Sequence, residues 1–95
     1  MMTLKLRPLV GVFAENKDKA REIRLHKIVP ALAKGQEVTL DFAGIDSATQ
    51  SFVHALISDL IRTYGCEVLD KLYFQNCTET VKKIIAIVVD YMQEG

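Results

Sequence analysis

The clearest pattern of apolar and polar positions lies in the middle of the chain, where a strand pattern is followed by a helix pattern. Residues 37–42 alternate apolar and polar side chains, which predicts a half-buried strand. Residues 49–64 place apolar side chains at every third or fourth position, which predicts a helix with one buried face. Gly65 is suited to cap the end of that helix, and the intervening residues 43–48 are expected to form a loop.

Weaker patterns predict the remaining elements on either side. Residues 2–6 alternate weakly and predict a short strand that Pro8 ends or places at a sheet edge. Residues 9–14 fit a second strand or a first helical turn equally well. Residues 71–75 predict a strand and residues 78–92 a final helix. The buried stripe of that helix is expected to consist of Val81, Ile84, Ile85, Val88, Tyr91 and Met92.

A helix is also predicted over residues 17–34, with Asn16 or Asp18 capping its start and Gly35 stopping it. Pro30 lies inside this segment. Because proline lacks a backbone donor and crowds the preceding turn, the helix is expected to kink or restart one residue earlier.

The order of these elements alternates between strands and helices, which indicates an α/β fold. We expect a small sandwich of three helices packed on a three- to four-stranded, parallel or mixed sheet. Residues 1–95 are interpreted as a single domain, because a chain of this length supports one core.

Composition limits the function classes. Twelve basic and twelve acidic side chains cancel, so the overall charge does not favour nucleic-acid binding. Two cysteines, Cys66 and Cys77, cannot build a disulfide framework and are interpreted as reduced thiols. The start of the chain lacks the pattern of a secretory signal, and the longest apolar run, 84–89, is far shorter than the ~20 residues that span a bilayer. We therefore expect a cytoplasmic protein without membrane contact.

Hydroxyl side chains gather at the predicted start of the helix 49–64. Ser47 and Gln50 fit a reciprocal capping box, and Asp46 is an equally suitable cap. Capping explains one or two of the hydroxyls of Ser47, Thr49 and Ser51, and it is favoured over phosphorylation on these residues alone. The other interpretation is an exposed phosphate acceptor or a surface that contacts a partner.

Other reactive side chains form no recognisable set. His54 and His26 are interpreted as surface histidines, because neither has a second metal-ligating residue at helical spacing, and no metal site is predicted. A pair of Cys77 with His54 remains open, since such pairs assemble in space. The preferred interpretation is that Cys77 is a small half-buried residue, while Asn76 and Glu79 cap the last helix.

Two clusters of charge carry weaker signals. The segment 17–27 holds five basic and two acidic residues, a mixture that suits a solvated helix more often than a nucleic-acid or partner contact. Asp41 and Asp46 follow the strand 37–42, where sites gather in α/β sheets. Two aspartates without a metal or a base are weak evidence for catalysis.

The ordered motifs of this chain resemble the STAS-like domain family, which is related to the domains of sulfate transporters and anti-sigma factor antagonists. The resemblance covers roughly residues 32–95. It rests on the strand ending "LDF", Gly44 with Ile45, the helix start at Ser51 and Phe52, and the segment "YFQNC" at 73–77.

The resemblance also implies a site. In STAS antagonists a kinase of the anti-sigma type phosphorylates a serine at the start of the corresponding helix, and the preceding loop and first turns contact partners. The family's acceptor position falls on Gln50, which cannot accept phosphate, and Phe52 stands where the family has glycine. Ser51 and Ser47 are therefore the candidate acceptors. STAS-like domains often accompany histidine-kinase-like ATPases, so a partner of that class is implied.

We therefore predict a non-enzymatic regulatory module, without catalytic residues or cofactor, that docks a protein partner through residues 46–54. The predicted contact residues are Asp46, Ser47, Thr49, Gln50, Ser51 and His54. Two alternatives stay open: a small cysteine- or histidine-dependent enzyme, and a nucleic-acid accessory domain that uses the helix 17–27. An apolar edge or helix face could also support a homodimer.

Overall fold

Three parallel strands form the central sheet. The computed structural model describes residues 2–94, with the side chain of residue 94 excepted. Strands β1 (Met2–Lys5), β3 (Val38–Asp41) and β5 (Leu72–Gln75) pair in the order β1-β3-β5. The register aligns Leu4 with Leu40 and Leu40 with Phe74. Strand β3 is buried along its whole length because it lies between the other two.

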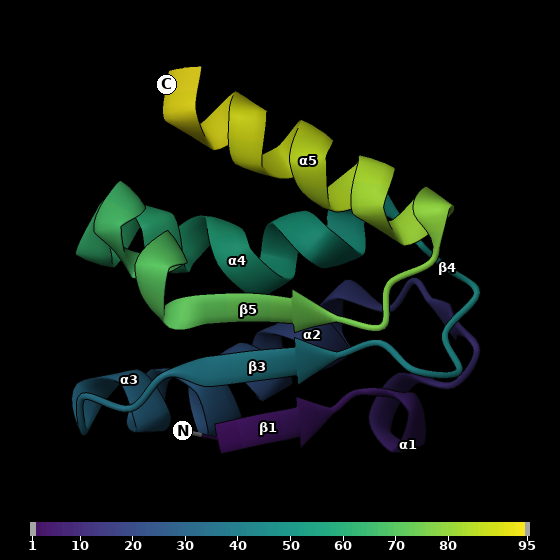
Figure 1. Cartoon of the computed structure of the whole chain (residues 1–95), viewed down its shortest axis with the longest axis horizontal. Coiled ribbons are helices and arrows are strands. Elements are labelled where there is room, and N and C mark those ends of the chain that lie inside the picture. The colour runs from purple at the N-terminus through teal and green to yellow at the C-terminus, as the bar shows by residue number, and fades with distance from the viewer. Residues whose placement is uncertain (1, 95) are drawn as a thin grey trace.

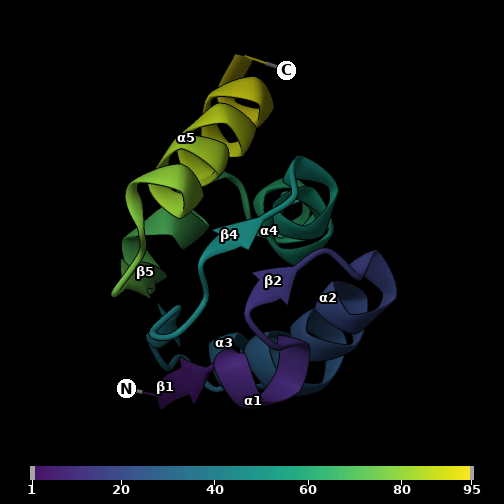
Figure 2. The ribbon, with the colours of Figure 1, turned by 90° about the vertical axis from the view of Figure 1, so that its right-hand side faces the viewer.

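Helices cover one face of this sheet and leave the other open (Figure 1, Figure 2). Helix α2 (Lys17–Ile23) continues through the π-helical segment η1 (Arg24–Ile28) into α3 (Val29–Ala33), and α4 (Gln50–Tyr64) packs beside α2. Helix α5 (Glu79–Glu94) packs on α4.

The open face is polar. Thr3 and Tyr73 flank Thr39 on it, and Lys5 and Gln75 flank Asp41. All-parallel sheets are usually covered on both faces. Here the outward side chains are polar, and the Tyr73 hydroxyl donates a hydrogen bond of 3.1 Å to Glu37.

Shorter elements lie around the carboxyl ends of the strands. They are the one-turn helix α1 (Arg7–Val10) and strands β2 (Phe13–Ala14) and β4 (Ser47–Ala48). The 3-10 helix η2 (Cys66–Lys71) instead precedes β5 at the amino ends of the strands. Strands β2 and β4 pair in parallel as a second, two-stranded sheet. Figure 2 shows β4 between β2 and the start of α5.

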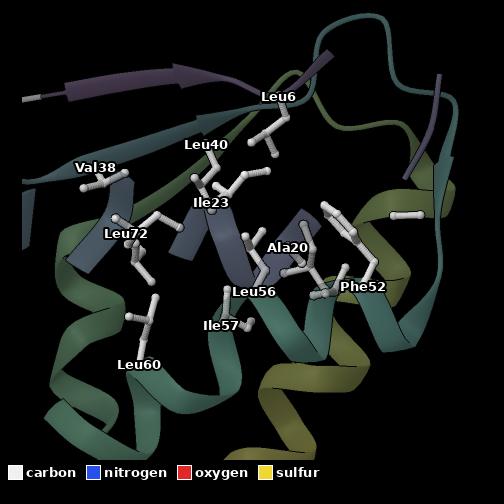
Figure 3. Close-up of a cluster of buried hydrophobic side chains, with 14 of the residues drawn as sticks. Leu6, Ala20, Ile23, Val38, Leu40, Phe52, Leu56, Ile57, Leu60 and Leu72 are labelled. Atoms are coloured by element: carbon white, nitrogen blue, oxygen red, sulfur yellow. The ribbon is translucent and has the colours of Figure 1, made fainter. Parts of the chain in front are cut away.

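The core fills the space between the sheet and helices α2 and α4. Figure 3 shows side chains of β3 and β5, together with Leu6 after β1, pointing toward Ala20 and Ile23 of α2 and toward one face of α4. Among the described residues, the large side chains that are fully buried are Leu6, Ile28, Val38, Leu40, Phe42, Ile45, Phe52, Val53, Leu56, Ile57, Leu60 and Val81.

The α/β class and the three-stranded parallel sheet expected from the sequence are confirmed. The number of helices differs, because residues 2–94 contain five α-helices rather than three. For residues 9–14 the sequence left a strand and a helical turn open, and the segment contains part of each. Helix α1 ends at Val10 and strand β2 begins at Phe13. Pro8 lies in the first turn of α1 and not in a sheet. A first-turn N–H has no acceptor within the helix, so the N–H that proline lacks removes no helical hydrogen bond. Tyr91 is 60% exposed, so it does not belong to the buried stripe of the last helix.

The helix predicted over 17–34 restarts at Val29, as Pro30 required. The unexpected feature is the π-helical segment before it, which accommodates the missing donor by widening the turn. This segment buries Arg24 and Ile28 on the same side as Ala20 and Ile23. Within residues 2–94, none of the helices has the length and apolar character needed to cross a membrane.

Candidate functional site

The predicted docking surface, residues 46–54, is the strand-to-helix corner at the carboxyl end of the sheet; we call it the corner. Three hydrogen bonds fix its backbone. The amide of Asp46 donates to the Val12 carbonyl at 2.8 Å, and the amide of Thr49 donates to the Ala14 carbonyl at 2.9 Å. On the opposite side the Thr78 hydroxyl donates to the Asp46 carbonyl at 2.9 Å. The corner is therefore held between the β2 strand and the start of α5.

Thr49 is the residue that caps α4. Its Oγ1 accepts a hydrogen bond of 3.1 Å from the amide of Phe52, and its backbone is extended, as an N-cap requires. The predicted capping box of Ser47 with Gln50 is wrong, and so is Asp46 as a cap. Ser47 lies in β4 opposite Phe13, three residues before the first helical residue, so its hydroxyl is not the cap of α4.

Replacing Thr49 with alanine is expected to destabilise the protein by about 1 kcal/mol, because the Phe52 amide loses its acceptor. Replacing Ser47 with alanine is the matched control and is expected to change the free energy of unfolding by less than about 0.5 kcal/mol. Urea denaturation followed by circular dichroism measures both. Equal losses for the two variants would contradict the assignment of the cap.

The six predicted contact residues differ in their exposure to solvent. Asp46, Gln50 and Ser51 are exposed, whereas the other three, Ser47, Thr49 and His54, are half-buried. The half-buried residues therefore offer less of their surface to a partner.

His54 is not the free surface histidine that the sequence suggested. Its ring stacks on Tyr91 of α5, with ring centroids 6.2 Å apart and planes inclined by 30°. The histidine therefore joins α4 to α5 while it borders the corner.

An exposed apolar pair beside the corner was missed by sequence reasoning. Val12 is 47% exposed and Phe13 is 46% exposed, and Phe13 lies directly opposite Ser47 in the register of β2 and β4. No periodicity over residues 9–14 could have identified them. Only the pairing of β2 with β4, two segments more than thirty positions apart, brings this apolar surface to the corner.

Asp41 ties together the strand ends beneath the corner. Its side chain is 7% exposed, and Oδ1 accepts hydrogen bonds from the Ala43 amide at 2.9 Å and the Asn76 Nδ2 at 3.0 Å. The bond from Asn76, followed by that from Ala43, holds the pKa of Asp41 below its ordinary value.

Asn76 therefore does not cap α5 with Glu79, as the sequence suggested. Its backbone φ of 60° lies in the left-handed region that asparagine tolerates, and its amide turns to Asp41. Thr78 takes the capping role, because its Oγ1 accepts a hydrogen bond of 3.2 Å from the Val81 amide.

A pH dependence of stability follows from Asp41. The pKa of Asp41 is lower in the folded state than the unfolded value of 3.8. The ionised carboxylate therefore stabilises the fold fully above pH 3.8, and this stabilisation is lost as the pH falls through the folded pKa. We expect Asp41→Asn to destabilise the protein near neutral pH and to flatten the fall of its melting temperature below about pH 4. An unchanged slope in the variant would contradict this assignment.

Gly44 allows the chain to turn from β3 into the corner. Its φ of 82° is unfavourable for other residues, and a Cβ there would lie 3.4 Å from the side chain of Arg7. Ile45, the next residue, is buried and anchors the loop in the core. This pair therefore fixes the path that presents the corner.

A comparison with protein families matches the model described as "STAS-like domain of unknown function (DUF4325)" to residues 19–82, about two thirds of the chain. The chain belongs to this family. The match begins within α2, before residue 32, where the motif resemblance starts, and it ends in the first turn of α5. No curated protein and no solved structure matches the chain.

The motif residues of this STAS-like domain have structural roles. In "LDF", Leu40 and Phe42 are buried and Asp41 receives the two hydrogen bonds described above. In "YFQNC", Phe74 packs on Phe42 with ring centroids 6.5 Å apart. Most of these motif residues therefore form the end of the sheet and the path into the corner.

Other chemistry has little geometric support in this STAS-like domain. Burial raises the pKa of the Cys77 thiol, which keeps it protonated at neutral pH. Its sulfur lies 3.9 Å from the carbonyl oxygen of Gln75. Among residues 2–94, no group of three histidine, cysteine or acidic side chains could hold a metal ion.

The basic residues of segment 17–27 are divided among different surroundings. Lys19 lies 3.6 Å from Glu22, and the buried Arg24 lies 3.1 Å from Asp59. Lys17 and Arg21 line a depression beside α4, whereas Lys27 lines another on the opposite side of α2. The segment therefore does not present one continuous basic face, which weakens the nucleic-acid interpretation.

Proposed function

We propose that this STAS-like domain is a non-enzymatic regulatory module that docks a protein partner through the corner. The observation that carries the proposal is the combination of a fixed backbone with an exposed apolar pair. Three hydrogen bonds hold the segment 46–49 in place, so binding costs little conformational entropy. Val12 and Phe13 add apolar surface beside the polar side chains of Asp46, Gln50 and Ser51.

The partner class that we propose is a histidine-kinase-like ATPase, including a kinase of the anti-sigma type. The family resemblance suggests this class, and the mixed surface of the corner suits a regulated complex, since an aromatic anchor surrounded by polar groups is typical of protein interfaces. We place this action in the cytoplasm, where the exposed thiol of Cys66 would stay reduced.

Phosphorylation of Ser51 would regulate the docking. Ser51 is exposed on the first turn of α4, whereas Ser47 is half-buried within β4, so Ser51 is the better acceptor. A phosphate there would lie at the positive end of the helix dipole and beside Lys17, which lines the same depression. The modified helix would remain folded while the charge of the docking surface changed.

The substitution Ser51→Glu tests this proposal. We expect it to weaken binding to a histidine-kinase-like ATPase module, encoded beside or fused to a family member, by about tenfold or more. The melting temperature should not fall, because a carboxylate is favourable in the first turn of a helix. Isothermal titration calorimetry measures the affinity.

Ala86→Glu, an equal charge change on the exposed side of α5, is the control and should leave the affinity unchanged. The proposal fails if Ser51→Glu binds the ATPase as tightly as the unmodified domain, or if both variants weaken binding equally. The homodimer suggested by the sequence stays a prediction, which the molar mass in solution would test.

A further inference from the structure

A shallow groove runs between α4 and the helical segment formed by α2, η1 and α3, on the side of α4 away from the sheet. Three adjoining depressions share lining residues along it: Lys17, His54 and Ala55 join the first two, and Arg24 and Asp59 join the second to the third. We call it the α2–α4 groove. It follows most of the 15 residues of α4, so its length is about 20 Å at 1.5 Å per residue.

One end of the α2–α4 groove is cationic. Lys17 and Arg21 line it one helical turn apart, and neither lies within 4.0 Å of a carboxylate among the side chains of residues 2–93. Asp18 lines the same end and offsets one of the two charges. Both α2 and α4 begin here, and the positive ends of two helix dipoles add to the attraction for a negative group.

The middle of the groove is a rigid cluster of ion pairs. Arg24 is 8% exposed, lies 3.1 Å from Asp59, and donates a hydrogen bond of 2.7 Å to the Ala55 carbonyl. Arg62 lies 3.0 Å from the other oxygen of Asp59. One carboxylate between two guanidinium groups leaves a net positive charge here and fixes α2 against α4.

The far end of the groove is apolar. Leu25 is 45% exposed and Tyr64 is 40% exposed, and both line the depression that also includes Val29 and Leu60. Exposed leucine and tyrosine side chains at the end of a charged groove are suited to receive an apolar side chain from a partner.

We propose that the α2–α4 groove binds an acidic amphipathic helix of a protein partner. Carboxylates of that helix would meet Lys17 and Arg21, and an apolar side chain about two turns away would meet Leu25 and Tyr64. The groove has the length for such a segment and the complementary charge.

Two other occupants fit less well. A small anion would leave the apolar end unused. A nucleic acid would be repelled by Asp18 and Asp59, and the cationic end offers no aromatic side chain on which a base could stack.

The groove adjoins the corner, because its first depression is also lined by Gln50, Ser51 and His54. The inference goes beyond the proposed function, since Arg21, Leu25 and Tyr64 lie outside the corner and bind a different segment.

A synthetic helical peptide of about 15 residues, with glutamates at one end of one face and leucines at the other, is a suitable probe. Titrated into the isotopically labelled domain, it should shift amide signals of α2 and α4 along the groove. The double variant Lys17→Glu with Arg21→Glu should weaken binding by about tenfold or more, and Leu25→Ser by about threefold or more. Added salt should also weaken binding.

The matched control is Lys71→Glu with Lys83→Glu, an equal charge change at two exposed lysines away from the groove. Absence of shifts at millimolar peptide, shifts elsewhere, or equal weakening by the control would overturn the proposal. So would binding of inorganic phosphate or of anionic phospholipid vesicles that needs Lys17 and Arg21 while the peptide fails. No ATPase is present in this titration, so its failure leaves the proposed role of the corner to be judged separately.

Discussion

Truncation of Phe42 to alanine is expected to cost about 3–5 kcal/mol of the free energy of unfolding. Phe42 is fully buried and its ring packs on Phe74 at the end of the sheet. Its backbone is held as well, because its amide donates a hydrogen bond of 2.9 Å to the Gln75 carbonyl. The chain therefore cannot collapse into the space left by the ring. A loss of this size is a large fraction of the ~5–15 kcal/mol that stabilises a typical domain.

Urea denaturation measures this loss as a lower midpoint with an unchanged slope. Phe13→Ala is the matched control, because it removes the same ring from an exposed position and should change stability by less than about 0.5 kcal/mol. Comparable losses of stability for the two variants would contradict the burial of Phe42 against Phe74 at the end of β3.

Phe13→Ser is expected to weaken binding of the histidine-kinase-like ATPase by about 10- to 30-fold, which corresponds to about 1.4–2 kcal/mol. Phe13 offers an exposed aromatic ring opposite Ser47 in the pairing of β2 with β4, and β2 is fixed by hydrogen bonds to the corner on both sides of Ser47. Aromatic side chains in such positions carry a large share of binding energy, because they bury much apolar area and lose little freedom. The fold should be unaffected.

Ile87→Ser is the control for this experiment. Ile87 is 47% exposed on α5, so the substitution removes a comparable apolar side chain from a surface outside the proposed interface. Calorimetric titration of the two variants should separate them by about tenfold or more in affinity. If Ile87→Ser weakened binding and Phe13→Ser did not, the partner would dock on α5.

Much of the fold could be predicted because its elements have clear periodicity. The alternation around Leu40 identified β3, and the regular spacing through Phe52 and Leu56 identified α4. Pro30 indicated the restart of the helix at Val29. These signals are local, since each depends on the side chains of one segment.

The remaining features depend on contacts between distant segments. No pattern in residues 9–14 or 43–48 reveals that Phe13 pairs with Ser47, and this pairing decides both the cap of α4 and the apolar surface of the corner. Asn76 looked like a helix cap because such residues favour that position, yet the buried carboxylate of Asp41 competes for its amide. The π-helical segment arises where Pro30 leaves a turn without its donor, a local adjustment that propensity does not predict.

The most direct test of docking through the corner is hydrogen exchange of the domain with and without the ATPase module. The first-turn amides of α4, at Gln50 and Ser51, have no acceptor within the helix and should exchange rapidly in the free domain. We expect binding to slow exchange at residues 46–54 and at 12–14. If exchange slowed only at the open face of the sheet or at α5, and exchange at the corner stayed unchanged, docking through the corner would be contradicted.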